Sequence, residues 1–305
     1  MVDSLPQRYT IDHSTARVAL ATCAELPELD DDDRLIAPAL AAVGVAAEPA
    51  VWDDPAVDWA GFDLVVVRNT WDYPARRGRF LEWARAAGRV VNPPAVLAWT
   101  TDKRYLCELA DAGLAVVPTL VAEPGVDPRA ALGGPADVVV KPAVGVGSIG
   151  TRRFAAAEHD AALAHVRALH ADGRAALVQP YLRGVEDGRG ETALIALGGA
   201  LSHAIHKGPM LAGAPAETFA DGLYVRERVV AREPTAAERD LAAAVLAFVT
   251  TRFGALPYAR VDVVPGPDGG APVVLEVELA EPSLFLGTAA GAPGRFAAAI
   301  AALLA

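Results

Sequence analysis

Cysteines, positive charges and long apolar runs are scarce in this sequence, and each scarcity excludes a class of protein. The 2 cysteines, Cys23 and Cys107, lie far apart and outside any metal-ligand spacing, which predicts free thiols in a reducing compartment. The 27 Lys and Arg residues are outnumbered by 38 Asp and Glu residues, and a net charge of −11 excludes a general basic field for nucleic acid. No apolar run is long enough to span a membrane, and the polar N-terminus has no apolar signal core. We therefore expect a soluble, cytoplasmic protein with no nucleic-acid or membrane partner.

Apolar residues are plentiful, at 53% of 305 residues, so the chain can form two or three compact units. We expect a loose tail over residues 1–14 and an N-terminal domain over residues 15–98. Short apolar strands alternate with helices in that domain, which is typical of an open parallel α/β sheet; the expected strands are Val18–Thr22, Phe62–Arg68 and Arg89–Asn92. The acidic run Asp30–Asp33 resembles a metal-binding cluster. We favour a capped, solvated helix start, because the free N–H groups of a helix attract negative charge.

Two further units are expected after this domain. A central unit over residues 99–176 combines helices and a strand with a glycine-rich loop, at Thr101–Ala112, Asp137–Lys141, 145–150 and Glu158–Leu169. A C-terminal unit over residues 177–305 begins beside a strand at Ala176–Gln179 and contains further strands, a hairpin and two helices, at Thr192–Leu197, Leu201–His206, 260–285, Ala236–Phe253 and Arg295–Leu304.

The hairpin sequence ARVDVVPGPDGGAPVVLEVELAEPSLF places four charged side chains together. Side chains alternate between the two faces of a strand, so a turn about Gly269 pairs 262 with 276 and 260 with 278 on one patch, formed by Arg260, Asp262, Glu276 and Glu278. The opposite face would carry Val261, Val263, Leu275 and Val277. Three carboxylates so close together need a counter-ion, and hard oxygen ligands suit Mg²⁺. A solvated polar sheet face is the alternative.

The segment GVGSIG at residues 145–150 matches the dinucleotide fingerprint G-x-G-x-x-G, which is weak evidence by itself. Lys141-Pro142 stands between the strand and the glycines, and Thr151-Arg152 follows where a P-loop needs Lys-Ser/Thr. A flexible loop whose N–H groups fold over phosphate oxygens remains, with a plain solvent loop as the alternative. Lys141 and Lys103 flank this loop, which favours a shared nucleotide.

With these motifs in order, the chain resembles the ATP-grasp superfamily of ATP-dependent ligases. The order TDK, VVVKP, GVGSIG, VQPYL, ET, HK, RVD, LEVE and EPS follows the family plan between residues 100 and 286. The segments VRNTWDYP, NPP and EPSLFL are most similar to the O-ureido-serine cyclo-ligases of cycloserine biosynthesis, near the glutathione-synthetase-like group. The resemblance implies an α/β fold, with α+β parts. It has an N-terminal parallel α/β substrate domain, a small central lid and a C-terminal mixed-sheet domain with the metal site.

The resemblance also implies site residues. Contacts to ATP would come from Lys103, Lys141, Gly145, Gly147, Ser148, Gly150, Gln179, Tyr181, Leu182 and Glu186, with Tyr181 and Leu182 using their backbone and Glu186 the ribose. Asp262, Glu276 and Glu278 would hold two Mg²⁺ ions, with Mn²⁺ as an alternative. Arg260 would stabilise the transferring phosphoryl group. Arg228 and Lys207 are further catalytic cations, and they would compensate for Glu278, where many relatives carry Asn.

Substrate contacts are expected from the loop after the second predicted strand, because ligands bind outside the carboxyl ends of strands in open α/β sheets. The candidates are Arg68, Thr70, Trp71, Asp72 and Ser283, although Trp71 and Tyr73 are also interpretable as packing aromatics.

The sequence thus predicts an ATP- and Mg²⁺-dependent carbon–nitrogen ligase, a monomer or homodimer. It would phosphorylate a small amino-acid-like carboxylate and capture the acylphosphate with an amine or ureido nitrogen. Ring closure within one substrate is the alternative within this class. A non-catalytic nucleotide-binding module and a nicotinamide-dependent oxidoreductase are the alternatives outside it.

Overall fold

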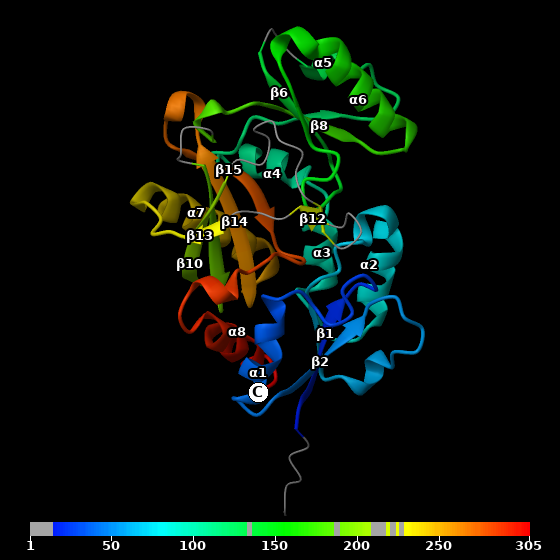
Figure 1. Ribbon diagram of the computed structural model, residues 1–305, viewed down its shortest axis with the longest axis vertical. Coiled ribbons are helices and arrows are strands. Elements are labelled where there is room, and N and C mark those ends of the chain that lie inside the picture. Colours follow the sequence, from blue (N-terminus) through cyan, green and yellow to red (C-terminus); the bar gives the residue numbers. More distant parts are fainter. Residues whose placement is uncertain (1–14, 133–135, 186–189, 209–217, 220–223, 226–228) are drawn as a thin grey trace, which may run out of the picture.

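The structure is a computed structural model that describes residues 15–132, 136–185, 190–208, 218–219, 224–225 and 229–305. The predicted tail at 1–14 and the predicted site residues Glu186 and Arg228 lie outside the described residues. Figure 1 shows three tiers: an N-terminal unit with the C-terminal helix at the bottom, a five-stranded sheet in the middle and a small central unit at the top.

The N-terminal unit is a parallel sheet of order β2-β1-β3-β4, which confirms the predicted open α/β sheet. Its strands are β1 (Arg17–Thr22), β2 (Ala46–Val51), β3 (Leu64–Val67) and β4 (Val90–Val91), and its helices are α1 (Ile36–Ala41), α2 (Arg77–Ala86) and α3 (Pro94–Thr100). The buried residues of β1 and β3 form its core with apolar side chains of α1 and α2.

Two elements of this unit are absent from our prediction. The edge strand β2 contains Pro49 and alternates only weakly in burial, so it carries no clear strand signal. No helix was expected directly after the predicted strand Arg89–Asn92, yet Pro94 begins α3, because proline is well accommodated in the first helical turn.

The central unit is an antiparallel sheet of order β5-β8-β6-β7 with α5 and α6 packed on it. The strands are β5 (Leu120–Ala122), β6 (Val138–Pro142), β7 (Arg152–Phe154) and β8 (Ala176–Pro180), and the helices are α5 (Arg129–Leu132) and α6 (His159–Ala171). Helix α4 (Tyr105–Asp111) precedes them and packs beside β15 (Pro272–Glu278) with the core of the five-stranded sheet (Figure 1). The predicted boundaries at 98/99 and 176/177 fall inside α3 and β8, because sheet pairing continues through β8 to Pro180.

The third unit is a sheet of order β13-β10-β9-β14-β15 whose strands all pair antiparallel. A parallel bridge between Val116 and Val274 adds the mixed character. The strands are β9 (Glu191–Leu197), β10 (Ala200–Lys207), β13 (Val229–Ala231), β14 (Tyr258–Pro265) and β15 (Pro272–Glu278), next to the short pair β11 (Thr218–Phe219) and β12 (Tyr224–Val225).

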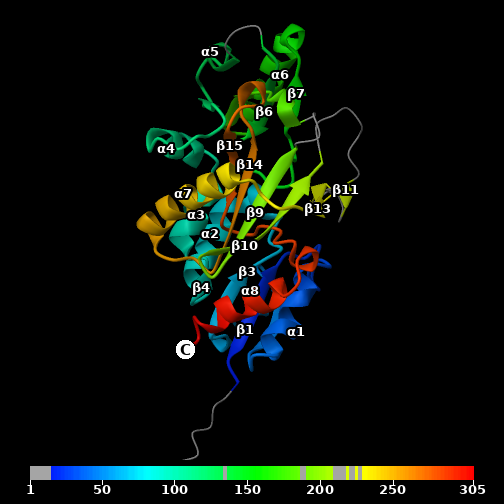
Figure 2. The same ribbon diagram turned by 90° about the vertical axis from the view of Figure 1, so that its left-hand side faces the viewer.

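Helices α7 (Ala236–Phe253) and α8 (Ala292–Ala301) lie against this sheet, as Figure 2 shows. Helices α3 and α4 share a buried core with α7 and the sheet. Helix α7 matches our prediction and packs Ala242, Val245 and Val249 on one face. Helix α8 packs on β9 and β10 and also against α1, so its Phe296 and Ile300 share a core with the N-terminal unit. No helix among the described residues is both long and apolar enough to cross a membrane.

Candidate active site

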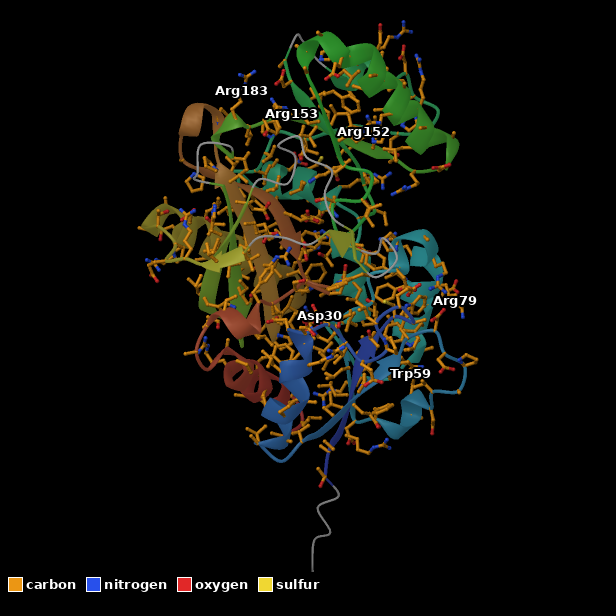
Figure 3. All side chains as sticks on the ribbon, in the orientation of Figure 1. Asp30, Trp59, Arg79, Arg152, Arg153 and Arg183 are labelled. Atoms are coloured by element: carbon orange, nitrogen blue, oxygen red, sulfur yellow. The ribbon has the colours of Figure 1, made fainter. Side chains whose placement is uncertain are left out.

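A cavity of about 530 Å³ lies where the three units meet, a size ordinary for a small-molecule site. The central unit contributes Lys103, Lys141 and the glycine loop, the sheet contributes Lys207 and the charged hairpin, and the N-terminal unit contributes Asp30, Trp71 and Tyr73. Figure 3 shows Asp30 in the middle of the molecule, whereas Arg152, Arg153 and Arg183 belong to the upper tier.

The hairpin has the predicted register. Residue Arg260 faces Glu278 and Asp262 faces Glu276 across β14 and β15. A bulge follows, because Val263 pairs with Val274. Leu275 is therefore the extra residue. It lines the cavity, so our placement of Leu275 on the opposite face is wrong.

Asp262 lies at the centre of a buried ion network. Its carboxylate accepts hydrogen bonds from Arg260 Nε at 2.8 Å and from Lys207 Nζ at 3.0 Å. Lys207 also pairs with Glu191 at 2.8 Å. Burial alone would raise the pKa of Asp262, but the Arg260 and Lys207 charges outweigh burial and hold that pKa well below its usual range.

The two glutamates of β15 differ in electrostatic environment. Glu276 pairs with Lys103 at 2.7 Å, and this cation together with Lys141 lowers its pKa against the effect of burial. Glu278 pairs with Arg260, yet burial and the neighbouring Glu276 and Asp262 charges raise its pKa to about 7. The extra negative charge at 278 is thus poorly compensated.

The chemistry of these oxygen donors fits Mg²⁺, because three carboxylates share one wall of the cavity. Within the described parts of the chain, no group of three or more His, Cys, Asp or Glu side chains is already arranged around a metal position. The physical reason is that each carboxylate of the hairpin is bonded to a lysine or arginine instead.

The glycine loop lies beside both predicted phosphate lysines. Lys103 Nζ donates to the Gly145 carbonyl at 2.6 Å. Lys141, on β6, is buried and has neither an ion pair nor a hydrogen bond among the described side chains, and burial lowers its pKa. The loop joins the antiparallel strands β6 and β7, and α6 begins only at His159. This geometry excludes the dinucleotide-binding alternative, which needs a strand leading directly into a helix.

An apolar wall with a polar edge borders the same cavity. Val117, Leu182 and Val264 pack together there. Gln179 donates to the Thr119 hydroxyl at 2.8 Å. The Tyr181 N–H donates to the Asp137 carbonyl at 2.9 Å. A backbone hydrogen bond from Tyr181 to a nucleotide base would therefore use the Tyr181 carbonyl. Our prediction had named the Tyr181 backbone without choosing between these two groups.

Three of the five predicted substrate residues are turned into the protein, away from the cavity. Arg68 is fully buried, bonds Asp33 through two nitrogens at 2.9 Å each and donates to the Pro282 carbonyl at 2.6 Å. Thr70 is fully buried, and Asp72 accepts from Trp52 and Arg76. Among the described residues that line the cavity, these three are absent. Our predicted substrate contacts from Arg68, Thr70 and Asp72 are wrong, because this loop turns these side chains into the protein.

Trp71 and Ser283 do line the cavity, and so do residues that our prediction omitted. The Trp71 indole donates to the Glu281 carbonyl at 3.0 Å, and the Ser283 carbonyl accepts from Arg260 at 3.0 Å. Tyr73 and Glu281 are two of the omitted residues. The motif EPS contains both Glu281 and Ser283, so the sequence held a signal for Glu281. Our prediction named only Ser283 from this motif.

Comparisons with known proteins agree over nearly the whole chain. A model of the D-cycloserine synthetase DcsG N-terminal domain matches residues 18–92. The cycloserine biosynthesis protein DcsG of Streptomyces lavendulae is 37% identical over 297 residues, which cover 93% of this chain and 97% of that protein. The crystal structure of D-cycloserine synthetase DcsG matches with a TM-score of 0.86 at 36% identity, over 95% of this chain and 100% of that one.

The ATP-grasp ligase PsnB, complexed with minimal precursor, Mg and ADP, also matches. Its TM-score is 0.59 at 19% identity, over 94% of this chain and 97% of that one. That likeness concerns the fold alone.

Proposed function

We propose a function from the premise that this chain belongs to the DcsG family of ATP-grasp ligases. The protein activates an amino-acid-like carboxylate with ATP and joins it to a nitrogen nucleophile. One observation supports this above all others. Both phosphate lysines, the glycine loop and the three hairpin carboxylates line a single cavity.

The first step is phosphoryl transfer. A carboxylate oxygen of the substrate bonds to the γ-phosphorus of ATP while the bond to the ADP oxygen breaks, and an acylphosphate results. Lys103 and Lys141 bind phosphate oxygens, the glycine loop covers them, and Arg260 stabilises charge on the transferring group. Bound Mg²⁺, held as two ions by Asp262, Glu276 and Glu278, supplies further charge neutralisation.

The second step is capture of the activated carbon. The nitrogen bonds to the acyl carbon, the bond to the phosphate oxygen breaks, and the nitrogen releases its proton to water. Lys207 acts as a positioning residue here, because it fixes Asp262 and Glu191 and keeps the metal-binding wall in place.

The likeness to D-cycloserine synthetase DcsG supports ring closure as the form of this reaction. D-cycloserine synthetase names a cyclic amino-acid product. We therefore propose O-ureido-serine as the substrate, with its own ureido nitrogen as the nucleophile. Cytoplasmic location, Mn²⁺ as a replacement ion, and a monomer or homodimer stay predictions.

The test is ADP release with O-ureido-D-serine, together with the mass of the first-formed product. Ring closure loses one water from one substrate, whereas ligation of two substrates gives a heavier product. Glu276→Ala is expected to abolish ADP release. Full activity in that variant would refute the metal assignment, and a lack of ATP binding in Mg²⁺ by calorimetry would refute the proposed function.

A further inference from the structure

The Glu281 carboxyl group is the feature of the cavity that phosphoryl transfer leaves unexplained. Its residue is 8% exposed and lines the cavity. Among the described residues no other residue donates a hydrogen bond to this carboxylate or forms an ion pair with it; only its own backbone N–H does so. Burying a carboxylate in a protein interior costs on the order of several kcal/mol, as it does for any ion. The cost is offset only when a cation or several hydrogen-bond donors face the carboxylate.

The neighbouring carboxylates are all engaged. Asp32 accepts the backbone N–H groups of Leu286 and Gly287 at 2.8 Å each. Asp30 accepts the N–H of Asp33, and Asp31 pairs with Arg34. These acidic side chains therefore serve the local structure. They do not form the capped, solvated helix start that we expected, because Asp32 makes no side-chain cap bond and Asp33 is buried against Arg68. Glu281 differs from them in having no such partner.

Cations in the cavity do not meet this need. Eight carboxylates and four cations line the described part of the cavity: Asp30, Asp31, Asp32, Glu191, Asp262, Glu276, Glu278 and Glu281 against Lys103, Lys141, Lys207 and Arg260. Lys103, Lys207 and Arg260 are already paired with other carboxylates. Lys141 lies on β6 next to the glycine loop. Burial and the Glu278 charge raise the pKa of the Glu281 carboxyl to about 8. A cation bound beside Glu281 would favour its charged form.

Two aromatic rings line the cavity in the same region. Trp71 follows β3 and positions Glu281 through the indole bond to its carbonyl. Tyr73 is 3% exposed and stacks on Phe80, with ring centroids 5.0 Å apart. Tyr73 lines the same cavity as Glu281, and burial and then the Glu281 charge raise the pKa of Tyr73. Aromatic rings attract ammonium groups within about 6 Å.

We propose that Glu281, with Trp71 and Tyr73, binds the ammonium group of the substrate, so that the enzyme accepts amino acids and rejects the same acids without the amine. This inference rests on the proposed function, because it places the substrate carboxylate in the same cavity. The ammonium supplies the missing counter-charge, and the rings contact its flank. Glu281 is thereby a specificity-determining residue and takes no part in phosphoryl transfer.

The test compares two matched ligands on the full chain loaded with Mg²⁺ and ADP. Calorimetry measures binding of O-ureido-D-serine and of 3-(ureidooxy)propanoate, which differ only in the amine. The wild type should bind the amine-bearing compound more tightly by about 30-fold or more, the size of a buried charge contact. Glu281→Gln keeps shape and removes charge, so its two dissociation constants should agree within about threefold, given the same principle.

Controls separate this role from others. Asp31→Asn removes an exposed carboxylate at the rim of the same cavity and should leave the ligand preference unchanged. Glu281→Asp should retain part of the preference, and thermal melting checks that each variant is folded. ADP with Mg²⁺ should bind Glu281→Gln with the same dissociation constant as the wild type. A raised dissociation constant would make Glu281 a metal ligand and overturn the inference.

The remaining outcomes are also decisive. Equal binding of both ligands by the wild type, a preference that survives in Glu281→Gln, or no binding of either ligand would each overturn the inference. Preferential binding of the amine without ADP release on addition of ATP would support the inference and refute the proposed function instead.

Discussion

Lys141 is the residue whose environment most clearly depends on a ligand. It is 6% exposed, its ammonium group has no ion pair or hydrogen bond with any described residue, and burial lowers its pKa. Holding an unpaired charge in that position opposes folding, so the position makes physical sense only if an anion occupies the cavity during function.

We therefore expect Lys141→Met to act in opposite directions on activity and stability. The rate constant kcat/KM for ATP should fall by about 100-fold or more, because a phosphate contact is lost in a dry site. The free energy of unfolding without nucleotide should stay equal or rise by about 1 kcal/mol, because an apolar side chain replaces a buried charge. Steady-state kinetics and urea unfolding measure the two effects.

Arg129→Met is the control, since Arg129 is a largely exposed cation on α5. It should change neither quantity. A Lys141→Met variant that loses stability and keeps its affinity for ATP would show that Lys141 is structural.

Arg68 illustrates the opposite case, a charge used entirely within the protein. We expect Arg68→Met to lower the free energy of unfolding by about 3–5 kcal/mol, because Asp33 is left as a buried, unpaired carboxylate. Urea denaturation gives the value. In the fraction that stays folded, KM for the substrate should remain within about twofold, as expected when a residue makes no ligand contact. A raised KM with unchanged stability would restore our original assignment of Arg68 to the substrate.

These two residues also show what the sequence could reveal. Lys141 was predictable because it ends an apolar strand directly before a glycine loop, so local order fixes its location. Arg68 also ends an apolar strand. Its partners Asp33 and Pro282 are 35 and 214 residues away in the chain, and only the tertiary structure shows that they surround it.

At the scale of elements, α7 has a start that joins three parts of the sheet unit. Thr235 and Glu238 form a capping box, with bonds of 3.2 Å and 2.7 Å. The Glu238 carboxylate also accepts from the Thr192 hydroxyl of β9 at 2.8 Å and from Arg232 at 3.2 Å. Burial alone would raise the pKa of Glu238, but these donors outweigh it and lower that pKa from the ordinary value of 4.5.

We expect Glu238→Gln to destabilise the fold by about 1–2 kcal/mol at pH 7. A lowered pKa in the folded state stabilises the protein above the ordinary value, and this contribution is lost as the pH falls through the lowered value. The difference between wild type and variant should therefore shrink below pH 4.5, the ordinary pKa. Urea unfolding at several pH values measures it, and a difference that grows toward acid pH would contradict the assignment.

The elements also differ in how far local patterns specify them. The hairpin register followed from alternation around a glycine-rich turn, and α7 lies where our prediction placed it, at Ala236–Phe253. The bulge at Leu275 has no such signal, because inserting one apolar residue into an apolar run leaves no visible change in the pattern of polar and apolar residues. The edge strand β2 and helix α3 depend on neighbours and on the position of a proline, which local pattern alone does not resolve.

At the scale of the whole molecule, the walls of the cavity come from three units that each have their own sheet, with a parallel bridge between Val116 and Val274 linking the central unit to β15. A ligand that contacts all three should therefore stabilise their arrangement. We expect ADP with Mg²⁺ to raise the melting temperature by several degrees, since a ligand at 100 times its dissociation constant adds about 2.7 kcal/mol. Thermal melts with and without EDTA measure the metal-dependent part, which should vanish in Glu276→Ala. An equal shift in the presence of EDTA would contradict metal binding at the hairpin.

The contacts between the loop after β3 and the loop after β15 have a consequence for engineering. Arg68 donates to the Pro282 carbonyl and Trp71 to the Glu281 carbonyl, so two segments more than 200 residues apart in the chain form one wall. A chimera that takes only its N-terminal domain from a relative would keep both bonds only if that domain carries arginine and tryptophan at these positions and its loop meets the two carbonyls in the same geometry. Recombination that seeks new substrates should therefore exchange residues 68–73 and 280–286 together, as one discontinuous cassette.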